Sequence, residues 1–429
     1  MASSSDPLRK CVVASGYYAK VDEEKECCCE VKDERVATMA SCIFNLSNTI
    51  VGSGILGLPK AFADVGLGLG TFFIFLFGSL AVFGLHLLAV SSVIAGDPRA
   101  SFRSVAARAA PKFTALIDAS VAIKCFGVAT SYLIVIGDTI PRVLRGSRRL
   151  WILAATASVA PLSMLGKLDA LKVTSAVSLG FVLWLALVVF AYRFKVDEEA
   201  VGEKRVVAEF DLNAARYLTT FVFAFTCHQN IFAIVNEIRK PSQRRVDAVI
   251  LISVGIALSL YLCVAVSGYD TFGDNVEGDI LDNYPATFAI SLTRFCIALL
   301  VLFSYPLQLF PSRTCALALL AHLRRKTPQD EDDAATALRS RVVATAVFLL
   351  ASSAIAVSVR SLDTVLSVVG ATGSTIVSYI LPGGIYYRLA PPGPMRTLAL
   401  GVFILGICII PGPRALEKVA VFLGFLEDV

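Results

Sequence analysis

Long apolar runs separated by short polar breaks organise this chain. Most runs are about 20 residues or longer, the length that an α-helix needs to cross the hydrocarbon core of a bilayer. The pattern therefore predicts an all-α membrane protein with about eleven spanning helices. The predicted spans are 37–62, 68–95, 113–141, 150–165, 171–193, 213–238, 246–268, 286–311, 341–359, 363–387 and 396–412.

The first predicted span is interrupted in its middle. Gly52, Ser53 and Gly54 break an otherwise apolar run, and the amides Asn45 and Asn48 lie just upstream. Glycine makes an unwound turn inexpensive, and unwound backbone exposes donors and acceptors that hydrocarbon cannot satisfy. Such a segment is tolerated where it lines a cavity, and secondary transporters use broken helices to build substrate sites near the bilayer midplane.

A second half-helix that starts near Ile55 would direct its N-terminal amides at a carboxylate. We therefore predict that the backbone from Val51 to Ile55 binds the carboxylate of a substrate. The alternative is that these small residues form a packing face between two helices. The asparagines upstream and Pro59 downstream favour the binding site.

The sixth predicted span also has a polar interruption. Its candidate substrate-lining residues are Phe225, Thr226, His228, Gln229 and Asn230. Matching interruptions five helices apart indicate a five-plus-five inverted repeat. His228 is a candidate proton relay, because the pKa of an ordinary histidine lies near neutrality; the alternative is an interhelical hydrogen bond.

Lys124 and Ser304 are further candidates for coupling to an ion. Lys124 sits about eleven residues into the third span, too deep to reach the interface easily. Asp118 lies about 240° away around the same helix and is a poor partner for it. Lys124 therefore needs a partner on another helix or a water-filled pocket, where it could replace a bound cation.

Ser304 precedes Tyr305 and Pro306, and the proline frees a carbonyl that could form half of a cation site. A proline kink without a ligand is the alternative.

Composition agrees with a membrane protein, since 56% of residues are hydrophobic, 17% are charged and mean hydropathy is +0.71. The basic residues behind the net charge of +5 are scattered through loops, so we expect no nucleic-acid partner.

Most basic loops share one side with the N-terminus, which predicts a cytosolic N-terminus. The loop from Arg142 to Arg149 disagrees with this rule, because it falls on the opposite side with the acidic loop 270–282.

Catalytic motifs are missing, and the three histidines are too dispersed for a metal site. We therefore expect neither an enzyme nor a bound cofactor. Residues 1–35 are polar and predict a disordered cytosolic tail, followed by a transmembrane domain over 36–412 and a short C-terminal tail over 413–429. Palmitoylation is possible at Cys27, Cys28 and Cys29, although an unmodified tail is an equal alternative.

Four segments resemble the amino acid/auxin permease family, which includes sodium-coupled neutral amino acid transporters and vacuolar amino acid transporters. The segments run from Asn45 to Pro59, from Lys124 to Asp138, from Phe223 to Asn230 and from Phe303 to Gln308. Together the matches span about residues 36 to 385. The resemblance implies a LeuT-like fold in the bilayer and cation-coupled movement of amino acids.

The resemblance also implies roles for single residues. Asn48 matches an asparagine that is linked to sodium in the sodium-coupled branch, and Ser304 takes the approximate place of that branch's eighth-helix hydroxyl. Because Tyr305 follows, a second adjacent hydroxyl is absent, which favours a proton over sodium. We expect a secondary active amino acid transporter of the plasma membrane or a vacuolar or lysosomal membrane. The alternatives are an amino-acid-sensing receptor of the same fold and a sodium-coupled neutral amino acid symporter.

Overall fold

A computed structural model describes residues 35–97, 99–195, 202–204, 214–323, 334–359 and 369–409. The predicted tails, apart from Arg35, lie outside these residues, as do Cys27 to Cys29. In the described part the chain is helical, and its β-type pairing is limited to a single parallel bridge between Ala37 and Ile238. The predicted all-α class is confirmed.

Each predicted span has a helical counterpart. The helices of the first half are α2 (Met39–Ile50), α3 (Gly54–Val65), α4 (Leu67–Ala95), α5 (Phe102–Ala109), α6 (Thr114–Thr139), α7 (Arg148–Ser163) and α8 (Lys172–Tyr192), with short turns η1 (Pro111–Phe113), η2 (Ile140–Arg142) and η3 (Leu168–Leu171). Those of the second half are α9 (Ala214–Ala224), α10 (Ile231–Glu237), α11 (Gln243–Phe272), α12 (Phe288–Leu323), α13 (Ala334–Ser358), α15 (Leu381–Leu389) and α16 (Pro394–Ile409), with η5 (His228–Asn230), η6 (Gly273–Asn275) and η7 (Ile280–Asn283). Two π-helical turns, η9 (Val369–Ser374) and η10 (Ile376–Ile380), lead into α15.

Seven of the described helical segments are long and apolar enough to cross a membrane, and the bent pair of α2 and α3 brings the number to eight. The axes of α2 and α3 meet at 51°, so the predicted break in the first span is a real bend. The sixth span is also divided, because α9 ends at Ala224 and α10 begins at Ile231. The exact number of crossings, predicted as about eleven, stays a prediction.

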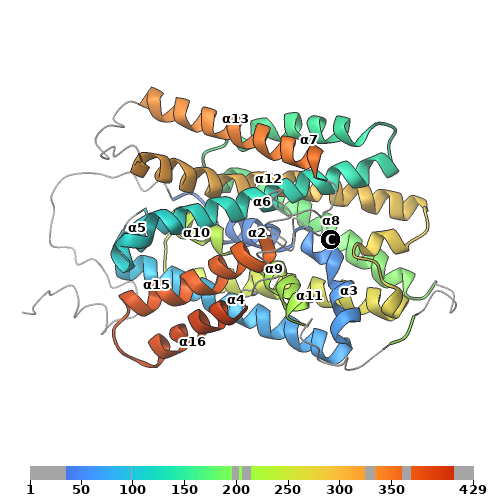
Figure 1. Cartoon of the computed structure of the whole chain (residues 1–429), viewed down its shortest axis with the longest axis horizontal. Coiled ribbons are helices and arrows are strands. Elements are labelled where there is room, and N and C mark those ends of the chain that lie inside the picture. Colours follow the sequence, from blue (N-terminus) through green and yellow to red (C-terminus); the bar gives the residue numbers. More distant parts are fainter. Residues whose placement is uncertain are drawn as a thin grey trace, which may run out of the picture.

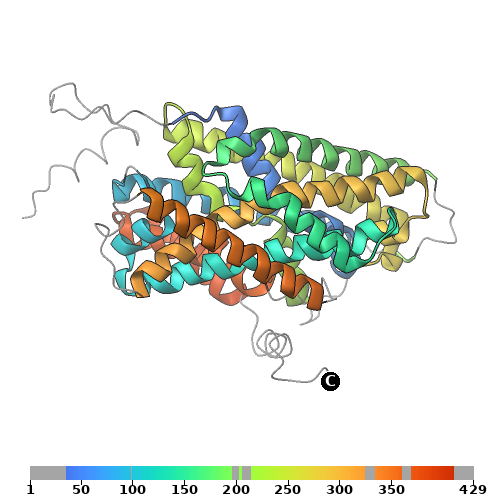
Figure 2. The same cartoon turned by 90° about the horizontal axis from the view of Figure 1, so that it is seen from above.

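The two interrupted helices lie inside the bundle. In Figure 1, α7 and α13 form one edge and α4 and α16 the opposite edge, with α2 and α9 between them. Figure 2 shows the same helices from above, aligned along the long axis of the molecule. This arrangement places both interruptions where neighbouring helices can satisfy the freed backbone groups.

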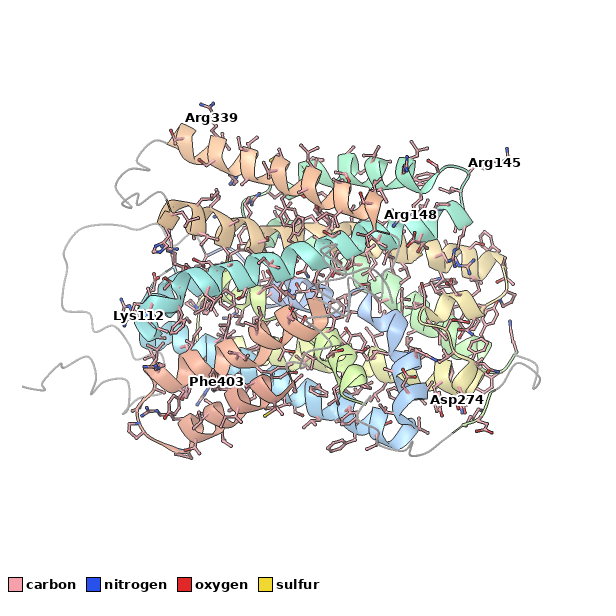
Figure 3. The ribbon with its side chains drawn as sticks, viewed as in Figure 1. Lys112, Arg145, Arg148, Asp274, Arg339 and Phe403 are labelled. Carbon is pink, nitrogen blue, oxygen red and sulfur yellow. The ribbon has the colours of Figure 1, made fainter. Side chains whose placement is uncertain are left out.

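Charged side chains gather at the two ends of the long axis. Lys112 and Arg339 lie at one end in Figure 3, and Arg145 and Asp274 lie at the other. The grouping matches the sides that the charge pattern assigned to these loops. Which end faces the cytosol stays a prediction.

Ion pairs and helix capping account for two of the four arginines that disagree with the charge rule, Arg142 and Arg148. Arg142 pairs with Asp282 across the loop, and Arg148 Nε lies 2.6 Å from Asp138 Oδ1. The Arg148 guanidinium also donates to the carbonyls of Ala356 and Val359, at 2.8 and 2.9 Å, near the end of α13. Cations are favourable at a helix C-terminus, so these arginines have structural partners here.

Asp279, in the loop between α11 and α12, predicts a pH-dependent stability. Its carboxylate accepts a hydrogen bond from Leu281 N at 2.9 Å, and burial raises its pKa from the ordinary 3.8 to about 6. The contribution of the protonated Asp279 to the stability of the folded protein is complete below the unfolded pKa of 3.8, and it is lost as pH rises through about 6. We expect Asp279→Asn, which keeps the acceptor, to unfold about 2 °C higher than wild type at pH 7.5 and to keep only part of that advantage at pH 5, because the advantage disappears fully only below pH 3.8. Thermal unfolding in detergent at both pH values tests this, and a pH-independent difference would contradict it.

Candidate functional site

A small cavity lies at the break in the first helix. The break itself, α6, the end of the α9 segment and α12 contribute its walls. The lining residues are Thr49, Ile50, Gly52, Ser53, Gly54, Lys124, Val128, Tyr132, Phe223, Ala224, Thr226 and Gln308. Half of these residues have polar side chains, and convergent polar groups fix the orientation of a bound small molecule.

The break presents backbone donors to this cavity. Gly52 N donates to Ile50 O at 3.0 Å and Leu56 N donates to Ser53 O at 3.2 Å. Between them, the amides of Ser53 and Gly54 have no hydrogen-bond partner among the described residues, and neither does the buried Ser53 Oγ. These donors stand at the N-terminus of α3, where the helix dipole favours an anion.

Two aromatic side chains close over the glycines of the break. A Cβ atom on Gly52 would lie 2.7 Å from the Tyr132 hydroxyl, and one on Gly54 would lie 3.2 Å from the Phe223 ring. Gly52 therefore lets the tyrosine approach the backbone closely. The Tyr132 hydroxyl and the free amides of the break face the same space.

Tyr132 was not among the site residues expected from the sequence. Lys124, Val128 and Tyr132 follow one another at a spacing of four residues on α6, and all three line the cavity. Such spacing keeps side chains near one face of a helix. That stripe, read from Lys124, is the signal that could have identified the tyrosine.

Among the described residues, Lys124 is the one charged residue in the cavity lining. Its side chain is 2% exposed, and its ammonium has neither a hydrogen bond nor an ion pair within the described part of the chain. Asp118 pairs instead with Arg103, at 2.9 Å. A buried ammonium without a partner is costly, so this position is suited to a group that meets an anion or releases its proton.

Asn48 and Ser304 lie in contact, as the resemblance implies. Ser304 Oγ donates to Asn48 Oδ1 at 2.8 Å, and Asn48 Nδ2 donates to Ser175 Oγ at 3.2 Å. The three side chains join α2 to α12 and α8. The polar atoms of Asn48 are therefore used in contacts between helices, outside the cavity lining.

The other predicted amides also join helices. Asn45 donates to Leu168 O at 2.8 Å, and Asn230 donates to Thr49 Oγ1 at 2.9 Å and to Leu307 O at 3.1 Å. Gln229 Nε2 donates to Gln308 Oε1 at 3.2 Å. Gln229 therefore contacts Gln308, which lines the cavity, without lining the cavity itself.

His228 is fully buried beside Gly84 of α4, where its Nε2 would lie 2.6 Å from an added Cβ. Neither ring nitrogen has a hydrogen-bond partner among the residues that the structure describes.

Of the predicted site residues, the cavity is lined by Gly52, Ser53, Gly54, Lys124 and Thr226. Those outside its lining are Asn45, Asn48, Val51, Ile55, Phe225, His228, Gln229, Asn230 and Ser304.

Contacts between α2, α10 and η3 close the bundle at the start of α2. Ala37 N donates to Glu237 O at 3.0 Å, and Arg239 N donates to Ala37 O at 2.9 Å. The Glu237 carboxylate accepts hydrogen bonds from the amides of Leu168 and Asp169, at 2.9 and 2.8 Å. Ser41 Oγ adds a bond to Asp169 Oδ1 at 2.7 Å. The ends of both interrupted helices are thus held together on this side.

Comparisons with known proteins agree with this architecture. The model of the family described as transmembrane amino acid transporter protein matches residues 35–411. Vacuolar amino acid transporter 5 of Schizosaccharomyces pombe is 39% identical over 389 residues, covering 86% of this chain and 90% of the relative. Vacuolar amino acid transporter 6 of Saccharomyces cerevisiae is 34% identical over 405 residues, covering 82% of this chain and 90% of the relative.

A solved structure shares the fold. The crystal structure of a point mutant of the Eremococcus coleocola manganese transporter superposes with a TM-score of 0.59 and covers 90% of this chain and 91% of that chain. The sequence identity is 9%, so the likeness concerns the fold alone. It confirms the predicted LeuT-like architecture, to which the interruptions of the first and sixth spans belong.

Proposed function

Because this chain belongs to the transmembrane amino acid transporter family, we propose that it is a secondary active transporter that moves amino acids by alternating access and couples their movement to protons. The family and its named relatives are transporters and not enzymes. The observation that carries the proposal is the cavity at the break, where two backbone amides without a partner among the described residues face a tyrosine hydroxyl and a lysine.

The substrate's α-carboxylate meets the start of α3 in this proposal. The free amides of Ser53 and Gly54 donate to it, as helix N-termini do to anions. The Tyr132 hydroxyl donates from the opposite wall, where it overhangs Gly52. Carbonyls and polar side chains of the first and sixth helices hold the ammonium group. Phe223 and Val128 supply apolar walls for the side chain.

Lys124 is the residue that we propose carries the coupling proton. It is the charged group of the cavity, and it has no carboxylate partner in the described part of the chain. A lysine that gains and loses its proton here would carry charge with the substrate, because buried lysines change protonation readily. His228, with both ring nitrogens unpartnered among the described residues, is the second candidate.

Sodium is the less favoured ion. The oxygen of the Asn48 side chain accepts from Ser304, so this pair satisfies itself without a cation. Tyr305, which follows Ser304, directs its hydroxyl to Ser352 at 2.6 Å and offers no second oxygen beside Asn48. These contacts support a proton.

The bundle that contains the first and sixth helices rocks against the rest in this proposal. The closing contacts of Ala37, Glu237 and Arg239 then form on one side of the membrane and break when the cavity opens there. The vacuolar names of the relatives support a vacuolar membrane, and the basic loops support a cytosolic N-terminus.

Uptake into proteoliposomes tests the proposal. Purified protein is reconstituted, and a panel of tritiated L-amino acids is supplied while the pH gradient and sodium are varied independently. We expect accumulation of at least one amino acid when a proton gradient is applied, with no requirement for sodium. No accumulation of any amino acid under either gradient would contradict transport, and binding without flux would favour a sensing receptor.

A further inference from the structure

Three buried polar side chains, those of Gln229, Gln308 and Tyr132, follow one another from η5 to the break in the first helix. We infer that Gln229 and Gln308 are positioning residues, which orient the Tyr132 hydroxyl so that its hydrogen is donated to the substrate's carboxylate. The inference rests on the proposed function and concerns how the same site recognises its substrate.

The three side chains come from three different helical segments. Gln229 on η5 is 3% exposed and lies outside the cavity lining, whereas Gln308 on α12 is 1% exposed and lines it. Gln229 Nε2 donates to Gln308 Oε1 at 3.2 Å, and the side chains of Gln308 and Tyr132 line the same cavity. The hydroxyl in turn stands 2.7 Å from the position of a Cβ on Gly52.

The hydrogen bonds of these three side chains have a preferred direction of donation. A glutamine side chain has one oxygen, which accepts, and one NH₂ group, which donates. Because Gln229 donates to the oxygen of Gln308, the NH₂ group of Gln308 is the part of this amide left to donate to the oxygen of Tyr132 in the inferred arrangement. The phenolic hydrogen is then free to point into the cavity, where the carboxylate of the proposed substrate would accept it.

The neighbouring residue holds Gln229 in place. Asn230 donates to Thr49 Oγ1 at 2.9 Å and to Leu307 O at 3.1 Å, which fixes η5 against α2 and α12. Gln229 Oε1 has no hydrogen-bond partner among the described residues, so the bond to Gln308 is the contact that uses this amide. A buried amide with one hydrogen bond, aimed at a cavity-lining residue, suits a role in orientation.

Gln229→Met tests the inference. Methionine keeps the length of the side chain but donates nothing, so the amide of Gln308 can turn and draw the tyrosine hydrogen to its own oxygen. We expect KM for the best tritiated substrate in proteoliposomes to rise about fivefold while the maximal rate stays within about twofold. Tyr132→Phe is expected to raise KM about tenfold.

A double-mutant cycle separates orientation from packing. In the Tyr132→Phe background, Gln229→Met should add no further rise in KM, because the hydroxyl that it orients is gone. An additive rise, or an unchanged KM for Gln229→Met alone, would overturn the inference. Gln243→Met is the matched control: Gln243 is buried, donates to Asp247 Oδ1 at 2.8 Å and lies on α11 outside the cavity lining. An equal rise in KM for this control would also overturn the inference.

A second measurement serves if Gln229→Met does not fold. Inhibition of wild-type and Gln229→Leu uptake by the α-carboxamide of the best substrate reports how strongly the site prefers a carboxylate. The preference should fall about fivefold in Gln229→Leu, and an unchanged preference would contradict the inference. Failure of the proposed function is distinguishable, since wild type itself would then accumulate no amino acid.

Discussion

Gly52→Ala is expected to reduce amino acid uptake at least about 100-fold. The added methyl carbon would lie 2.7 Å from the Tyr132 hydroxyl, closer than packed side chains allow. Either the tyrosine or the unwound backbone must move, and in the proposed site both bind the carboxylate. Because each movement displaces a donor, we expect the loss to appear in both KM and the maximal rate. Uptake of tritiated amino acids into proteoliposomes that contain equal amounts of folded protein measures it.

Gly180→Ala is the matched control. Gly180 lies within α8, and a Cβ there would meet no atom within 4 Å. The same chemical change should therefore leave uptake within about twofold of wild type, because alanine is tolerated better than glycine inside a helix. Folded Gly52→Ala protein with wild-type uptake would show that the break does not bind the substrate.

Lys124→Met is expected to abolish accumulation driven by a pH gradient, a loss of at least about tenfold. The methionine fills a similar volume in the cavity but cannot carry a proton. Exchange of labelled for unlabelled substrate needs no net proton movement, so it should persist in the variant. Comparing gradient-driven uptake with exchange in the same proteoliposomes separates coupling from binding.

Lys60→Met is the control for this substitution. Lys60 belongs to α3, its side chain is 41% exposed, and it lies 3.9 Å from Asp64 at its nearest. We expect it to retain accumulation and its dependence on pH, since an exposed pair of this kind contributes little. Unchanged pH dependence in Lys124→Met would exclude this lysine as the coupling group and direct attention to His228.

The sequence was sufficient to predict where the helices are interrupted. Gly52 and Gly54 mark the first break because glycine is out of place inside a spanning helix unless the backbone has a reason to unwind. The polar run from Thr226 to Asn230 marks the second break, because hydrocarbon tolerates such groups only beside other protein or water. Both signals are local, so a single sequence carries them.

The partners of the polar side chains could not be predicted in this way. Asn48 meets Ser304 across 256 positions of sequence, and Asn45 meets Leu168 across 123. A buried amide takes whichever acceptor the neighbouring helix presents, and helix packing decides which one that is. The apolar pattern of α6 likewise does not show which face meets the cavity, and only the four-residue spacing from the charged Lys124 points to Tyr132.

The backbone pairing of Ala37 with the end of α10 sets an energy scale for opening. Two hydrogen bonds connect these segments, and each is worth about 1 kcal/mol net of the water that replaces it. Breaking both costs roughly 2 kcal/mol, and the bonds that Leu168 and Asp169 donate to Glu237 add to the cost of opening on this side. The open form is therefore a minor state, and a substrate or proton makes it predominate only if it binds that form more tightly by at least this free energy.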